Sequence, residues 1–222
     1  MHPIFVTMTK VQKNHQEAAE AFVRLLNIMD ELRTQCPWDQ KQTMESLRTL
    51  SIEELYELSD AILENKPSEI RKELGDLFLH LVFYARIADE KNWFRLSEVL
   101  HGICDKLIER HPHIYGDVEA NDAETVKQNW EKIKLKEGHR SVLAGVPNSL
   151  PALVKAWRMQ EKASGVGFDW KHEAPVWDKI TEEIQEFKQA VQEGSEREKE
   201  DEFGDLLFSL VNLARFQHIN PE

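Results

Sequence analysis

The residues of this chain best suited to chemistry are acidic side chains that recur at helical spacing. Glu53, Glu54 and Glu57 form an E-E-x-x-E pattern, and Glu73 and Asp76 follow as E-x-x-D. On a helix, residues three or four positions apart share one face, so each segment presents its carboxylates together. Two such helices packed antiparallel would bring four carboxylates to one point.

The same acidic pattern returns in the second half of the chain at one constant offset. Its members have the same types and spacing: Glu182, Glu183, Glu186, Glu202 and Asp205. The apolar positions agree at this offset too, since Leu77 and Ala85 match Leu206 and Ala214. Agreement of both the acidic and the apolar positions predicts an internal duplication. Gly75 and Gly204 stand between the acids of both copies, which predicts a close backbone approach there.

Carboxylates held this close need a neutralising partner, which can be a metal cation, a nearby Lys or Arg, or a proton. Ligands that are all oxygen, without Cys or His, suit Mg²⁺ or Mn²⁺. A di-iron bundle would need Glu-x-x-His pairs, which neither copy supplies. The plain alternative is that these acids are the solvated face of a bundle. For Glu54 there is a specific alternative, because Ser51-x-x-Glu54 fits a helix capping box.

Composition limits the possible partners. The 222 residues carry 28 basic and 40 acidic side chains, a net charge of −12, which argues against binding to nucleic acid or to an anionic membrane. The N-terminus lacks a signal-peptide pattern, and no apolar run is long enough to span a bilayer. Cys36 and Cys104 form no spacing motif, so a reducing cytoplasm is expected.

Hydrophobic periodicity predicts an all-α protein made of two tandem helical-bundle repeats. In the first repeat we expect helices at about 16–32, 47–63, 68–88 and 94–110. A short charged helix at about 126–136 and a linker at 138–151 follow, and then a helix at about 151–163 and two helices with the second acidic set. The loop Phe168-Asp169-Trp170 stands where Trp38-Asp39 stands in the first repeat. The predicted divisions are 1–120 for the first repeat, 121–150 for the short helix and linker, and 151–222 for the second repeat.

Several further motifs join the acidic sets. They are Cys36-Pro37-Trp38-Asp39 with Gln42-Thr43, KLIERHPH at 106–113, WEKIK at 130–134, SVLAGVPNSLPAL from Ser141, and VGFDW at 166–170. With these motifs the chain resembles the MazG family, the tandem-repeat nucleoside triphosphate pyrophosphohydrolases of the all-α NTP pyrophosphatase superfamily. The resemblance covers nearly the whole chain from about residue 16.

The resemblance implies a Mg²⁺-dependent enzyme, with Mn²⁺ possible, that cleaves nucleoside triphosphates to the monophosphate and pyrophosphate, and a homodimer. The family's metal ligands correspond to Glu54, Glu57, Glu73 and Asp76 in the first copy and to Glu183, Glu186, Glu202 and Asp205 in the second. Glu53 and Glu182 would be outer acids that orient or deprotonate the attacking water. Substrate-binding candidates are Lys106, Arg110, Trp130 and Lys134.

One departure from the family pattern concerns the second repeat. Family members follow their second copy with a helix bearing a K-x-x-x-R pair and then a Trp and a Lys. This sequence supplies such a set, Lys106 to Lys134, after the first copy only, so the second repeat is expected to lack its final helix. Two alternatives to the enzyme stay open: a catalytically weak nucleotide-binding or regulatory module, and a structural dimerisation bundle with solvated acids.

Overall fold

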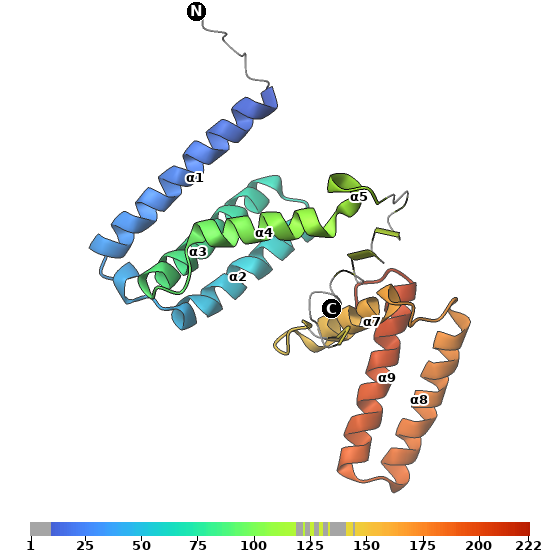
Figure 1. Cartoon of the computed structure of the whole chain (residues 1–222). Helices are drawn as coiled ribbons and strands as arrows, with labels where there is room; N and C mark the ends of the chain where they lie inside the picture. The colour runs from blue at the N-terminus through green and yellow to red at the C-terminus, as the bar shows by residue number, and fades with distance from the viewer. Residues whose placement is uncertain are drawn as a thin grey trace, which may run out of the picture. The chain divides into compact units, whose positions relative to one another are not determined.

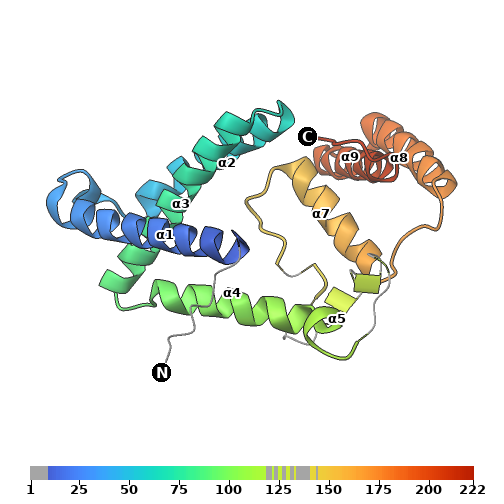
Figure 2. The same ribbon diagram turned by 90° about the horizontal axis from the view of Figure 1, so that it is seen from above.

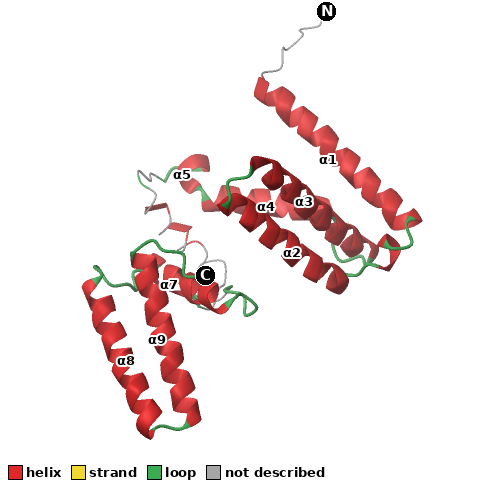
Figure 3. Ribbon diagram, turned by 180° about the vertical axis from the view of Figure 1, so that it is seen from behind, coloured by secondary structure: helices red, strands yellow, loops and turns green. Residues whose placement is uncertain are grey.

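The computed structural model describes residues 10–118 and 145–222, together with 122, 125, 126, 129, 130, 133 and 141–143. Helices and the loops that join them account for all of these residues, without a strand among them, which confirms the predicted all-α class (Figure 3). The chain divides into two compact units, residues 1–105 and 106–222. The predicted division at 120 and 150 stays a prediction.

The first unit is organised around a helical hairpin. Its elements are α1 (Lys10–Gln35), η1 (Asp39–Lys41), α2 (Met44–Leu63), α3 (Pro67–Glu90) and the first part of α4 (Leu96–Arg110). Figure 1 shows α2 and α3 side by side, and α1 packs against α3 (Figure 2). The helix ends follow the local sequence, because Thr43 caps α2 and Pro67 begins α3.

The core of the first unit lies where α1, α2 and α3 meet. Its buried apolar side chains come from all three helices: Met29, Leu47, Val82, Phe83 and Ile87. Phe83 is 2% exposed, and the guanidinium of Arg33 lies 5.5 Å from the centre of its ring. Arg33 also pairs with Glu90 at 2.9 Å, which ties α1 to the end of α3.

The second unit contains the hairpin of the second acidic set. Beyond the end of α4 its elements are α5 (Pro112–Tyr115), α7 (Ala152–Gly165), α8 (Ala174–Glu193) and α9 (Glu196–Phe216). Both α8 and α7 pack on α9 (Figure 1). Ser195 and Glu198 form a capping box that begins α9. The predicted helix at 126–136 falls mostly outside the described residues.

Two sequence expectations are wrong in detail. Ser51 is an interior residue of α2, and the capping box of that helix is formed by Thr43 and Ser46. No heavy atom beyond its own helix backbone and chain neighbours lies within 4 Å of a Cβ built on Gly75 or Gly204, so among the described residues neither glycine serves a close approach. In addition, the apolar face of α3 is only partly buried within one chain, and three of its side chains are exposed: Leu74, Phe78 and Leu81.

Among the described residues, none of the helices combines the length and the hydropathy that crossing a membrane requires.

Candidate metal centres in the two repeats

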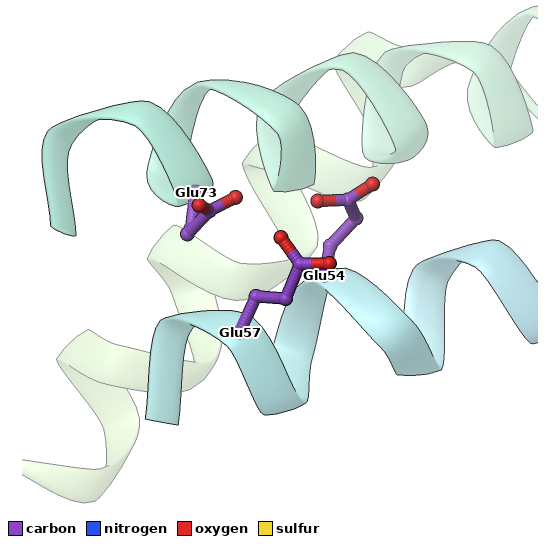
Figure 4. A group of neighbouring side chains, drawn as sticks. All are labelled: Glu54, Glu57 and Glu73. Atoms are coloured by element: carbon purple, nitrogen blue, oxygen red, sulfur yellow. The ribbon is translucent and has the colours of Figure 1, made fainter. Parts of the chain in front are cut away.

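The first acidic set meets in the space between α2 and α3. Glu54 and Glu57 project from α2 towards Glu73 on α3, and one oxygen of each lies within 4.8 Å of the others (Figure 4). Spacing of three residues puts the two α2 carboxylates on one face, as the sequence predicted. The hairpin therefore brings three of the four predicted ligands together.

Glu73 is the most buried member of this first centre. Its side chain is only 5% exposed, and its Oε2 is buried without a hydrogen-bond partner. The other oxygen, Oε1, accepts a hydrogen bond from Lys72 Nζ at 2.9 Å. A buried carboxylate oxygen without a partner is costly, so this atom favours a bound cation.

Lys72 is the cation that the chain itself supplies to the first centre. Its Nζ also lies 3.8 Å from Glu57 Oε2 and 3.7 Å from Asp76 Oδ2. The hydrogen bond to Glu73 and the nearby carboxylates raise the pKa of Lys72. The lysine side chain is 58% exposed, so it can turn into solvent when another cation enters.

The remaining predicted residues of the first set lie around this centre. Asp76 lies outside the group of three carboxylates, but its charge affects the pKa of Glu54 within that group. Burial, and then the charges of Asp76, Glu57 and Glu73, raise the pKa of Glu54. Glu53 is exposed on α2, and its role as an outer acid stays a prediction.

The second centre is built from the same hairpin in the second repeat. One oxygen each of Glu183 on α8 and of Glu202 and Asp205 on α9 lies within 4.8 Å of the others. Glu186 is not part of this group of three. Burial, followed by the charges of Glu186, Glu183 and Asp205, raises the pKa of Glu202.

Glu183 is the buried carboxylate of the second centre, as Glu73 is of the first. It is 4% exposed, and its Oε2 is buried without a hydrogen-bond partner. Lys179 Nζ lies 2.7 Å from Glu183 Oε1 and 2.9 Å from Glu182 Oε1, and these two hydrogen bonds raise the pKa of the lysine. The predicted outer acid Glu182 is thus held by an ion pair.

The two lysines were not predicted, and the duplication could not have predicted them. At the offset that relates Glu73 to Glu202, Lys72 corresponds to Asp201 and Lys179 corresponds to Leu50. The repeats therefore place an ammonium group beside a buried glutamate from different helices. Clustered carboxylates need a nearby positive charge, which Lys72 supplies in the first repeat and Lys179 supplies in the second.

The donor set fits a hard divalent cation. Each centre offers only carboxylate oxygens, from two helices, and one of those oxygens is buried and unsatisfied. Mg²⁺ binds such oxygens and keeps several waters, so three carboxylates are enough for it.

The substrate-binding candidates are only partly described. Lys106 and Arg110 lie one turn apart on α4, as predicted. The ring of Trp130 meets that of His111 edge-on, with 5.1 Å between their centres. Lys134 lies outside the described residues. The role of all four in substrate binding stays a prediction.

Comparison with known proteins identifies the family. The family model described as the MazG nucleotide pyrophosphohydrolase domain matches residues 42–115 and 173–220, so one matched segment contains each carboxylate hairpin. The chain belongs to this family of all-α nucleotide pyrophosphohydrolases.

Individual relatives are similar over most of the chain. The nucleoside triphosphate pyrophosphohydrolase/pyrophosphatase MazG of Thermotoga maritima is 47% identical over 212 residues, which cover 93% of this chain and 80% of that protein. The nucleoside triphosphate pyrophosphohydrolase of Escherichia coli K12 is 43% identical over 203 residues, or 86% of this chain and 76% of that protein. A protein of the same name from Mycolicibacterium smegmatis is 34% identical over 157 residues, or 68% and 48%.

Proposed function

We propose that this protein hydrolyses nucleoside triphosphates to the nucleoside monophosphate and pyrophosphate with the help of Mg²⁺, which Mn²⁺ could replace. The observation that carries the proposal is the buried, partnerless carboxylate oxygen that stands beside two further carboxylates in each repeat. The names of the relatives support the same reaction.

The metal ligands would come from the two acidic sets. In the first repeat they are Glu54, Glu57, Glu73 and Asp76, and in the second they are Glu183, Glu186, Glu202 and Asp205. When bound, the ion would activate a water molecule and neutralise charge on the phosphates. Lys72 and Lys179 would turn away from the glutamates they now neutralise, because the metal takes over that role.

The remaining residues would handle the water and the substrate. Glu53 or Glu182 would orient the attacking water and accept its proton. The water oxygen adds at the α phosphorus, the bond from that phosphorus to the oxygen bridging to the β phosphate breaks, and pyrophosphate leaves with the bonding electrons. Lys106, Arg110, Trp130 and Lys134 would bind the substrate, the three cations at its phosphate oxygens.

The active form we propose is a homodimer. Large apolar side chains on α2 and α3 are exposed in the single chain: Leu55, Ile62, Leu74, Phe78 and Leu81. A second copy that covers this face would complete a four-helix bundle, which is how helices bury such stripes. The cytoplasm is the compartment we propose, since it supplies the substrate and keeps Cys36 and Cys104 reduced.

Isosteric substitutions of the buried glutamates test the proposal and assign activity to a repeat. Glu73→Gln and Glu183→Gln remove a charge without changing shape. Each is expected to abolish the Mg²⁺-dependent turnover that its own repeat supplies. The matched controls are Glu69→Gln on α3 and Glu193→Gln on α8, which are exposed and should retain activity. Full activity in the double variant Glu73→Gln/Glu183→Gln would refute the proposed centres.

A further inference from the structure

The second repeat contains a cavity that the carboxylate chemistry does not use. Its volume is about 640 Å³, and it lies between α7, the loop after it, and α9. Its walls are mostly apolar and aromatic, with contributions from Met159, Phe168, Trp170 and Phe208. Gln160 and Asn212 are among the few polar side chains that line it.

The corresponding positions of the first repeat are filled. Asn212 corresponds to Phe83, a core residue that is 2% exposed, at the offset that relates the two acidic sets. Ala163 corresponds to Arg33 at the offset that relates Trp38-Asp39 to Phe168-Asp169. Arg33 and Phe83 stack on each other in the first repeat. The second repeat has smaller residues at both positions, and both of them line the cavity.

The two amide side chains leave hydrogen-bonding capacity in the cavity. Gln160 is 7% exposed, and its Nε2 donates to the backbone oxygen of Phe208 at 2.7 Å. Its Oε1 is buried without a hydrogen-bond partner. Asn212 is 5% exposed, and its Oδ1 accepts hydrogen bonds from Arg215 at 2.8 and 3.0 Å. A buried acceptor without a partner in an apolar cavity suits a ligand that brings an N–H group to it.

Helix α9 carries residues of both the cavity and the carboxylate centre of the same repeat. Asp205 and Asn212 are two helical turns apart on α9, so they share a face at a separation of about 10 Å. Phe208, whose backbone binds Gln160, lies between them. A ribose and its first phosphates can span this separation. A nucleotide whose phosphates lie at the carboxylate centre would reach the cavity with its base.

We propose that this cavity binds the nucleobase of the triphosphate substrate. The aromatic rings of Phe168, Trp170 and Phe208 provide surfaces for stacking, and Gln160 Oε1 accepts a hydrogen bond from an N–H of the base. The inference rests on the proposed function and adds to it that base recognition belongs to the second repeat. The first repeat has Phe83 and Arg33 in that space.

Substitutions that restore the residues of the first repeat test the cavity. Asn212→Phe and Ala163→Arg should each raise the KM for nucleoside triphosphates roughly tenfold or more, because the stacking site is blocked. Binding of Mg²⁺ alone, measured by calorimetry, should not change. Ala152→Arg introduces the same side chain at an exposed position of α7 outside the cavity lining and should keep the wild-type KM. A KM within about twofold of wild type in both filled variants, with circular dichroism showing them folded, would overturn the proposal, since a blocked stacking site must weaken binding by more than that.

Photolabelling of the unaltered chain gives an answer that does not depend on how the variants fold. A triphosphate with an azido group on its base should label tryptic peptides 163–171 or 200–215. Label confined to peptides outside the second repeat would overturn the cavity assignment. Failure of the wild type to hydrolyse any triphosphate would instead refute the proposed function, and the labelled positions would still decide whether the cavity binds a base.

Discussion

Lys72 Nζ lies 2.9 Å from Oε1 of Glu73, while the second oxygen of the same carboxylate is buried with no partner. The glutamate is thus half satisfied by a lysine that is mostly exposed. An ion that binds between α2 and α3 would satisfy the second oxygen and compete with the lysine for the first. Glu183 and Lys179 repeat this relationship in the second hairpin.

Replacing Lys72 by Met should make the first centre more dependent on metal. Without Mg²⁺ the variant should unfold at a lower temperature than wild type, because three carboxylates lose their neutralising charge. With Mg²⁺ its Tm should rise by more than that of wild type, since the competing ammonium is gone. Differential scanning calorimetry with and without Mg²⁺ measures both effects. Arg71→Met, one residue earlier and exposed, is the control. An equal or smaller Mg²⁺ shift in Lys72→Met would contradict this account.

The raised pKa of Glu54 predicts how stability depends on pH. Because the native state binds this proton more tightly than the unfolded state, the metal-free protein should become more stable as pH falls through the raised pKa towards the ordinary value of 4.5. Glu54→Gln should lack that gain. Denaturant unfolding of both proteins across this range gives the difference, which cancels the other titrating groups. A difference that is constant with pH would show that Glu54 is not strained by its neighbours.

Most of the helical plan could be predicted from the sequence because periodicity, caps and prolines act locally. The predicted helices at 68–88 and 94–110 are α3 and α4 within two residues at each end. The pairing of the acidic sets could be predicted too, because an antiparallel hairpin with acids on both facing sides brings those acids close together. Spacing along one helix does not show how far a side chain reaches, so Asp76 and Glu186 were expected in the central groups and lie outside them.

Other features depend on packing that the pattern does not encode. The apolar stripe of α3 could be recognised, but which of its residues are buried within one chain depends on where α1 lies. Leu81 is therefore exposed while its neighbour Val82 is core. The cavity left a signal that was missed: Phe83 aligns with Asn212 at the offset that aligns the acids. A polar residue at a position that is apolar core in the other repeat indicates that the two repeats differ in function at that position.

Phe83 should be the most costly single position in the first core. Phe83→Ala removes a fully buried ring and the surface on which Arg33 stacks, so the free energy of unfolding should fall by about 3–5 kcal/mol. Urea denaturation followed by circular dichroism measures the loss. Leu63→Ala, which changes a side chain that is 74% exposed, should cost far less. Similar costs for the two substitutions would show that the core lies elsewhere.

The exposed face of α3 predicts the oligomeric state. Leu81→Glu places a charge at a position that is 61% exposed in the single chain and apolar in the proposed dimer. Size-exclusion chromatography with light scattering should show a dimer for wild type and a monomer for this variant. Leu81→Met keeps the volume and apolar character and should remain dimeric. A wild type that is monomeric at high concentration would contradict the dimer.

The proposed reaction is hydrolysis between the α and β phosphates at carboxylate-bound Mg²⁺. Phosphorus NMR of a nucleoside triphosphate incubated with the wild-type chain and Mg²⁺ tests it most directly, because every product has its own resonance. Pyrophosphate and nucleoside monophosphate should appear together in equal amounts, and only when the divalent ion is present. Release of orthophosphate with nucleoside diphosphate, or a spectrum that does not change, would contradict it.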